Sequence, residues 1–288
     1  MPECMDRAAD FIWKNARLLD RQRFAHHFLG GSRDGVVSAL QAYQNDDGGF
    51  GNALEPDMRC PTSQPQFQEV GLRILDEVGF GGGMVEGACN FLQTIATDEG
   101  GVPWALANVD PYPHAPWWAP EEVLKANINP TGAIAGLLHK RGVHHAWLAG
   151  ATEFCWRVID GGIANDPHGL MCVLTFLENA PDQDRARAAF ETIGGLIFDQ
   201  GLVCMDPDDP GYVKKPLDWA PRPESWCRAL FNDEVIGTHL DALEARQAED
   251  GGWCISWEAV SPSCELEWRG VLTVDALLTM RAYGRLGD

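Results

Sequence analysis

Three aspartates stand within four residues, at Asp206, Asp208 and Asp209 in the sequence DPDDPG. Carboxyl groups crowded together in a dry site resist ionisation, because like charges and loss of hydration both raise their pKa values. Such a group can act as a general acid near neutral pH. The same sequence is also typical of a turn, since aspartate binds nearby backbone and proline fixes φ. The segment therefore predicts either a proton donor or a structural turn.

Four other residues are alternative acids or bases. Glu55 and Asp57 follow a glycine-rich loop, where the simpler interpretation makes them partners of Arg59 or helix caps. Glu267 precedes a tryptophan at the start of the last predicted helix and could reach a cavity. His168 comes directly after an Asp-Pro helix start, and its near-neutral pKa range suits a proton relay.

Aromatic residues are numerous, with 11 tryptophans in 288 residues, and many stand beside loops. Their ring faces can fill a core, or they can stabilise a cation in a pocket without reacting with it. In the sequence YPHAPWWAP, two adjacent tryptophans between prolines cannot both face one core. We therefore expect Trp117 or Trp118 to line a cavity or its lid. The predicted substrate pocket consists of His114, Trp117, Trp118, Tyr212, Trp219, Trp226, Trp257 and Trp268.

Charge and composition narrow the function classes. The chain has 22 basic and 42 acidic residues, a formal charge of −20, and 45% of its residues are hydrophobic. Such a field repels phosphate backbones and anionic membranes, so nucleic-acid binding is not expected. The nine cysteines are never closer than ten residues and contain no CxxC pair. Together with the lack of an 18-residue apolar run, this predicts a cytoplasmic protein with reduced thiols and no transmembrane segment.

Glycine-rich acidic loops recur about every fifty residues, around Gly49, Gly101, Gly162, Gly201 and Gly252. Between them, aliphatic residues spaced by three and four predict two helices per repeat. Helix starts are predicted at Ser63 with Gln66, Asn129-Pro130, Asp166-Pro167 and Ser261-Pro262. Glu265 and Arg269, four residues apart, are expected to form a helical ion pair. We predict an all-α single domain over residues 1–288, with five to six helical hairpins that stack openly or close into a ring.

Two loops carry a recognisable motif. QAEDGGW at 247–253 fits the pattern QxxDGxW, QNDDGGF at 44–50 fits it with Phe in place of Trp, and TDEGGVPW at 97–104 is a weaker version. These loops resemble the QW repeats of the α/α-toroid superfamily of terpenoid cyclases and protein prenyltransferases. The resemblance implies a closed α/α toroid, or barrel, with a central cavity. The motif residues tie hairpins together, so we assign them to the fold: Gln44, Asp47, Phe50, Gln247, Asp250 and Trp253.

DPDD also resembles the DxDD motif of class II terpenoid cyclases, which implies Asp208 as the proton donor with Asp206 and Asp209 as modulators. The implied activity is of cyclase or isomerase type, with protonation of a neutral isoprenoid or other lipophilic substrate in the aromatic cavity. Two departures from the family pattern weaken the resemblance to class II cyclases. The family motif leads into a helix, whereas Pro210-Gly211 follows here, and class II cyclases build their site between two helical domains, whereas this chain has length for one.

Two other functions stay open: a non-catalytic protein that binds a lipophilic or peptide ligand, and a prenyltransferase with Lys214, Lys215 and Arg222 as a diphosphate clamp. The acidic loops oppose a bare diphosphate, so transfer would need Mg²⁺. Zinc would need Asp57 and Cys60, whose Asp-x-x-Cys spacing differs from the Asp-x-Cys of protein prenyltransferases. We therefore predict no cofactor, and a monomer or homodimer whose partner is a lipophilic small molecule.

Overall fold

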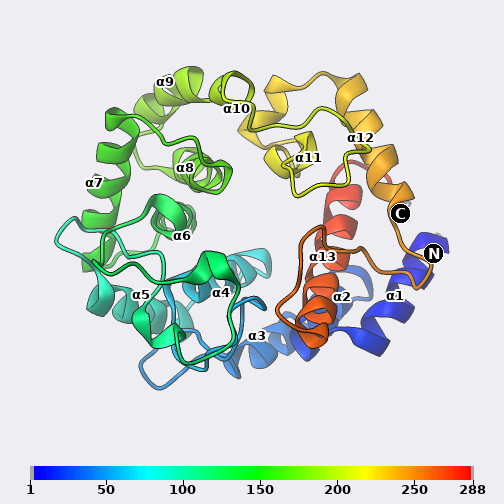
Figure 1. Cartoon of the computed structure of the whole chain (residues 1–288), viewed down its shortest axis with the longest axis horizontal. Coiled ribbons are helices and arrows are strands. Elements are labelled where there is room, and N and C mark those ends of the chain that lie inside the picture. The colour runs from blue at the N-terminus through cyan, green and yellow to red at the C-terminus, as the bar shows by residue number, and fades with distance from the viewer. Residues whose placement is uncertain (1–2, 287–288) are drawn as a thin grey trace. The chain divides into compact units, whose positions relative to one another are not determined.

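The structure, a computed structural model, describes residues 3–286 and is all-helical (Figure 1). In this part of the chain the only β-type pairings are two isolated bridges, between Gln44 and Phe50 and between Met58 and His114. The prediction of an all-α protein is confirmed. The chain divides into two compact units, which we call unit 1, Met1–Ala39 with Gly194–Asp288, and unit 2, Leu40–Ile193.

Unit 1 combines helices from both ends of the chain. The longest, α13, contacts α1, α2 and α12, and α11 contacts α12. Figure 1 shows α13 in red beside α1 and α2 in blue. The helices are α1 (Glu3–Asn15), α2 (Leu18–Phe28), α3 (Arg33–Gln41, which ends just past the unit boundary), α10 (Leu196–Asp199), α11 (Pro216–Trp219), the 3₁₀ helix η3 (Trp226–Leu230), α12 (Asp233–Ala245) and α13 (Pro262–Ala282).

The core of unit 1 forms where one loop tryptophan meets two helices. On α1, apolar residues spaced by three and four present Phe11 and Ile12, both fully buried, to Val274 and Leu277 of α13. Trp253, from the loop before α13, joins the same cluster and is 4% exposed. Burying side chains of this size stabilises the fold by about 1.5–3 kcal/mol each.

Unit 2 is built around a close helix pair, α6 and α8. A β-carbon on Gly136 of α6 would lie 2.4 Å from the Thr175 carbonyl oxygen of α8, so glycine allows this contact. Helix α6 also contacts α4 and α7. The helices are α4 (Pro65–Glu77), α5 (Gly83–Ile95), η1 (Ala107–Val109), η2 (Pro116–Trp118), α6 (Ile128–Lys140), α7 (Ala146–Gly161), α8 (Pro167–Asn179) and α9 (Gln183–Ile193).

Two of the predicted helix caps are confirmed. The Asp166 carboxylate accepts the N–H groups of His168 and Gly169 at the start of α8, and the Ser261 hydroxyl accepts the N–H of Cys264 at the start of α13. The predicted cap at Asn129 lies two residues late, because the side chain of Asn127 makes the cap.

The capping box predicted at Ser63 and Gln66 is wrong. Helix α4 starts after Gln64, and the Ser63 hydroxyl donates to Asp47 at 2.8 Å. Gln66 instead donates to the Asn129 side chain at 3.1 Å. Both side chains therefore bind partners that are distant in the sequence, and neither forms the predicted capping bond.

Three of the five glycine-rich loops share one backbone pattern, and we name them loop A (44–50), loop B (96–102) and loop C (247–253). In each, the second residue exchanges backbone hydrogen bonds of 2.8–2.9 Å with the fifth and sixth. The fifth residue is a glycine with φ between +82° and +92°: Gly48, Gly100 and Gly251. The loops at 159–166 and 198–209 form different turns, so the repeat is regular in three of its five predicted positions.

Each of the three loops presses its left-handed glycine against the backbone of a neighbouring helix. A β-carbon would lie 2.6 Å from the Gly87 carbonyl oxygen of α5 in loop A, 2.5 Å from that of Gly150 in α7 in loop B, and 2.1 Å from that of Arg7 in α1 in loop C. Real contacts are never this short, so only glycine fits. The glycines thus set how closely each loop approaches its helix.

Motif side chains complete these joints. Gln44 donates to the carbonyl oxygens of Gly48 and Met84, and Gln247 donates to those of Gly251 and Cys4, all at 2.8–3.0 Å. Each glutamine therefore binds its own loop and the neighbouring helix together. Loop B has alanine at this position, at residue 96. The structural role predicted for the motif is confirmed.

Asp250 of loop C determines the partner of Arg269. The Arg269 guanidinium donates to the Asp250 carboxylate at 2.6 Å, and this bond lowers the pKa of Asp250. The ion pair predicted between Glu265 and Arg269 is therefore replaced by a pair with loop C. Tertiary contact prevails over helical spacing here, because loop C places the Asp250 carboxylate within hydrogen-bond reach of Arg269, which is 8% exposed.

The glycine contact in loop C can be tested by adding a methyl group. We expect Gly251→Ala to lower the free energy of unfolding by more than about 3 kcal/mol, because the methyl collides with the Arg7 carbonyl. Gly284→Ala is the control, since Gly284 also has positive φ, +70°, with no atom within 4 Å of its β-carbon position. It should cost about 1–2 kcal/mol from backbone strain alone. Equal losses of unfolding free energy for the two variants, measured by urea denaturation, would contradict this account.

Candidate functional site

The DPDD segment lies in unit 1 on a loop that we call the DPDD loop, residues 204–214, closed by a bond of 2.8 Å from the Cys204 N–H to the Lys214 carbonyl. The Asp206 carboxylate accepts the N–H of Asp208 at 2.9 Å. The Asp209 carboxylate accepts the N–H of Gly211 at 2.7 Å. Both bonds are aspartate turns, the structural alternative raised by the sequence.

A buried lysine binds the backbone carbonyl groups of this turn. Lys215 is 7% exposed, and its ammonium donates to the carbonyl oxygens of Pro207 and Asp209, both at 2.7 Å. Burial lowers the pKa of Lys215, and the nearby Arg246 lowers it further. The Lys215 N–H donates to Asp218 of α11 at 2.6 Å, which anchors the lysine itself.

Two more basic side chains bind the same loop. Arg246 donates to the Pro207 carbonyl at 2.7 Å, and His239 Nε2 lies 3.3 Å from the Met205 carbonyl oxygen. His239 is 3% exposed, and burial lowers the pKa of its imidazole. Carbonyl groups at residues 205, 207 and 209 thus bind basic groups on α12, directly after α12 and before α11.

These contacts bear on the predicted acid. Asp206 and Asp208 are exposed, and Asp209 is half-buried with both oxygens accepting bonds, one from Gly211 and one from the Cys204 thiol at 3.7 Å. A general acid kept protonated by crowding needs a dry site, which differs from the exposed position of Asp208. The role of Asp208 stays a prediction, and its surroundings favour the turn.

Three of the predicted pocket residues lie together in unit 1, and we call them the aromatic cluster. The Tyr212 and Trp257 ring centroids are 5.4 Å apart with planes at 77°, and those of Trp257 and Trp268 are 5.3 Å apart at 83°. Edge-to-face pairs of this kind are favourable by about 0.5–1.5 kcal/mol each. The Lys214 ammonium lies 4.6 Å from the Tyr212 ring centroid. The DPDD loop and the C-terminal aromatic residues therefore meet in one cluster.

A cavity of about 480 Å³ opens beside the cluster, and we call it the Trp257 cavity. It is lined by residues 255 and 257–262 and by Glu265 in the first turn of α13. Its lining combines an indole ring and aliphatic side chains with two carboxylates. The hollow is open to solvent, and its volume falls within the range of small-ligand sites.

The other predicted residues of unit 1 lie apart from this cavity lining. Trp219 is 4% exposed and fills the core, and Trp226 is half-buried at the start of η3. Glu267 is half-buried on α13, two residues after Glu265. The indole N–H groups of Trp219 and Trp268 are buried without a hydrogen-bond partner among the described residues.

The predicted diphosphate clamp is not assembled. Lys215 is engaged by loop carbonyls, Lys214 lies over Tyr212, and Arg222 pairs with Glu224 at 3.3 Å. Each cation therefore already has a different partner, which weighs against the prenyl-transfer interpretation.

In unit 2, Glu55 and Asp57 are 6% and 2% exposed. They follow Asn52 and Ala53, two consecutive non-glycine residues with φ of +56° and +59°, a strained backbone. The Asp57 carbonyl accepts the N–H of Ala115 at 2.8 Å, so the loop at 51–64 is fixed to the aromatic loop at 104–118. Glu55 and Asp57 each take part in an interaction with other groups, and their role as acid, base, cap or ion-pair partner stays a prediction.

The two adjacent tryptophans of unit 2 point to different surroundings, as expected. Trp118 is 7% exposed and packs on Trp104 with centroids 4.8 Å apart, whereas Trp117 is 46% exposed. Half-buried His114 donates through Nδ1 to the Tyr112 carbonyl at 2.8 Å. His168 is half-buried in the first turn of α8, where its backbone N–H is capped by Asp166.

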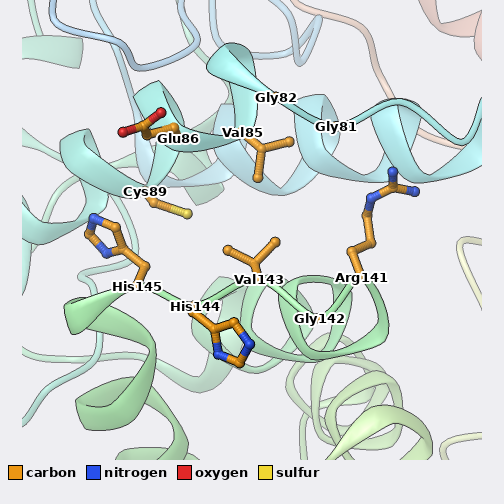
Figure 2. Close-up of a pocket in the computed structure, with 10 residues that line it drawn as sticks. All are labelled: Gly81, Gly82, Val85, Glu86, Cys89, Arg141, Gly142, Val143, His144 and His145. Carbon is orange, nitrogen blue, oxygen red and sulfur yellow. The ribbon is translucent and has the colours of Figure 1, made fainter.

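Unit 2 has a second cavity of about 370 Å³, between the start of α5 and the turn at 141–145 (Figure 2). Val85, Val143 and the Cys89 sulfur point toward one another there. Burial, with a smaller effect from Glu86, raises the pKa of the Cys89 thiol to about 11, so the thiol stays protonated and unreactive. His145 caps α7 through Nδ1, at 3.2 Å from the Trp147 nitrogen. These residues serve packing and capping.

Metal and membrane features are described for residues 3–286. No group of three or more His, Cys, Asp and Glu side chains there is arranged to hold a metal ion. Cys60, half of the considered zinc pair, is fully buried, and burial raises the pKa of its thiol. No helix in this part of the chain has the length and apolar character to cross a membrane.

Comparisons with known proteins establish the fold alone. No protein-family model matches the sequence, and no curated protein matches it. Among solved structures, the crystal structure of a protein from Actinoplanes is similar, with a TM-score of 0.57 over 97% of this chain and 98% of that chain. The two sequences share 16% identity, so the similarity says nothing about a shared activity.

Sequence reasoning missed Asp218 and His239, and it considered Lys215 only as part of a diphosphate clamp. Lys215 and Asp218 stand in the sequence KKPLDW. Pro216 directly follows Lys215 and Asp218 comes three residues after it, a pattern that is typical of a helix start. That signal could have located the start of α11. Nothing in the sequence shows that Lys215 and His239 bind one loop, since the contact joins α12 to a turn 34 residues away.

The role of Lys215 can be tested with its neighbour as the control. We expect Lys215→Met to lower the free energy of unfolding by about 2–3 kcal/mol and to speed hydrogen exchange in residues 204–214, because two backbone carbonyls lose a charged donor from a buried side chain. Lys214→Met removes the same charge from a half-buried side chain and should cost less than about 1 kcal/mol. Similar effects of the two variants would contradict the contacts described.

Proposed function

We propose that the protein binds a lipophilic small molecule at the Trp257 cavity of unit 1. The observation that carries this proposal is the combination of the aromatic cluster with an adjoining cavity of about 480 Å³. Concave sites with aromatic and aliphatic walls and a few polar groups are typical ligand sites. An isoprenoid is the first class to test, in line with the resemblance of loops A and C to QW repeats.

The finer fold prediction is also a proposal. We propose that the helical hairpins belong to a closed α/α toroid of the terpenoid cyclase and prenyltransferase type. The shared backbone pattern of loops A, B and C supports a repeated unit, and Gln44 and Gln247 make equivalent bonds to neighbouring helices.

Ligand binding can be measured by isothermal titration calorimetry with farnesol. We expect Trp257→Ala to weaken binding at least about tenfold, because the indole supplies the largest apolar wall. Trp117→Ala, which removes an exposed tryptophan of unit 2, should leave affinity unchanged. Trp257→Phe keeps an aromatic ring and should retain most of the affinity, which separates lost binding from misfolding. Equal affinity of wild type and Trp257→Ala would refute the site.

A second candidate function is acid catalysis on the bound molecule, in the manner of a cyclase or isomerase. One observation favours it. Asp218 is open to solvent, yet protein packed around it raises the pKa of its carboxyl group, as a proton donor requires. The bond from the Lys215 N–H and the charge of Lys214 act in the opposite direction and lower this pKa. Asp218 is therefore an alternative candidate for the proton donor beside Asp208.

Product analysis by mass spectrometry after incubation with farnesol and squalene tests this second candidate. If protonation occurs, Asp218→Asn should abolish product formation by a factor of about 10² or more, while the amide still accepts the Lys215 N–H. Asp208→Asn should then retain turnover. Loss of activity in Asp208→Asn alone would instead support the DxDD-type assignment, and binding without any product would leave the binding function.

A further inference from the structure

The charged groups that line the Trp257 cavity are both acidic. Glu258 lies next to Trp257 in the chain, and Glu265 lies in the first turn of α13. Both side chains are exposed, so each presents a carboxylate to whatever enters the cavity. No Lys, Arg or His is among the lining residues.

The nearest helical base to Glu265 is engaged elsewhere. Arg269 stands one turn further along α13, but its guanidinium donates to Asp250 of loop C at 2.6 Å. Its ring contact is with Phe11 of α1, 4.5 Å from the centroid. The Arg269 guanidinium is therefore hydrogen-bonded to Asp250 and not to Glu265, although the charges of Glu265 and Arg269 still interact. The residues that line the cavity carry only negative charge.

The aromatic wall, like the two carboxylates, favours a positively charged ligand. Faces of tryptophan and tyrosine attract ammonium and guanidinium groups by about 0.5–2 kcal/mol. The cluster already shows this preference, since the Lys214 ammonium lies over the Tyr212 ring. Ile255, Ala259, Val260 and Pro262 supply apolar surface on the other parts of the wall.

We infer that the Trp257 cavity selects a lipophilic cation, an amphiphile with an ammonium head group and a hydrocarbon chain. The head group would meet Trp257, Glu258 and Glu265, and the chain would lie on the aliphatic lining. The net charge of −20 further concentrates cations at the surface. This inference rests on the proposed function, because it names the ligand class of the same site.

The test compares dodecylamine with dodecan-1-ol, probes of equal chain length, by calorimetry in 150 mM salt and below micellar concentrations. We expect the amine to bind at least about tenfold more tightly than the alcohol. The variant Glu258→Gln/Glu265→Gln should remove most of this preference without changing affinity for the alcohol. Glu121→Gln/Glu122→Gln, which removes two exposed acids of unit 2, is the matched control and should change neither affinity.

The outcomes separate the two proposals. Equal binding of alcohol and amine to the wild type would overturn the head-group inference and leave the lipophilic site intact. An amine preference that survives Glu258→Gln/Glu265→Gln, or that the control variant also removes, would assign it to overall charge and overturn the inference. Absence of binding by both probes would overturn the lipophilic site as well.

Discussion

The close approach of one left-handed glycine to a helix backbone is the constraint on which unit 1 depends. Gly251 can lie against the Arg7 carbonyl only without a side chain, and Gln247 then binds the Cys4 carbonyl at 2.8 Å. This joint fixes loop C on α1, and Trp253 enters the core between α1 and α13. With loop C in this position, Asp250 accepts a hydrogen bond from Arg269, and Glu265 lines the cavity without a hydrogen bond from that arginine. A packing requirement thus determines the charge of the candidate site.

The DPDD loop shows a similar dependence of surface on buried groups. The carboxylates of Asp206 and Asp208 are exposed. The shape of the loop depends on the buried ammonium of Lys215, which donates to two loop carbonyls. Removing a buried charged donor from two backbone acceptors costs more than removing a surface charge. The aspartates therefore cap a turn whose stability comes from Lys215, and the same loop carries Tyr212 into the aromatic cluster.

Sequence patterns predicted the parts of the structure that local interactions determine. Helical spacing gave the all-α class, Asp166-Pro167 and Ser261-Pro262 marked two helix starts, and the QxxDGx motif located loops A and C. Where a distant partner competes, local rules failed: Ser63 binds Asp47 rather than capping α4, and Arg269 binds Asp250 rather than Glu265. The contact of Tyr212 with Trp257 joins residues 45 positions apart, so the sequence could suggest the pocket residues but not which of them meet.

Hydrogen exchange of the whole chain with and without saturating farnesol tests the central claim most directly, because it reports where a ligand binds without any substitution. Ordered binding at the Trp257 cavity should slow exchange in residues 255–268 and in the DPDD loop, with little change in unit 2. Slower exchange confined to unit 2, at residues 81–89 and 141–145 around the second cavity, would contradict the assignment. Unchanged exchange throughout the chain would contradict it as well.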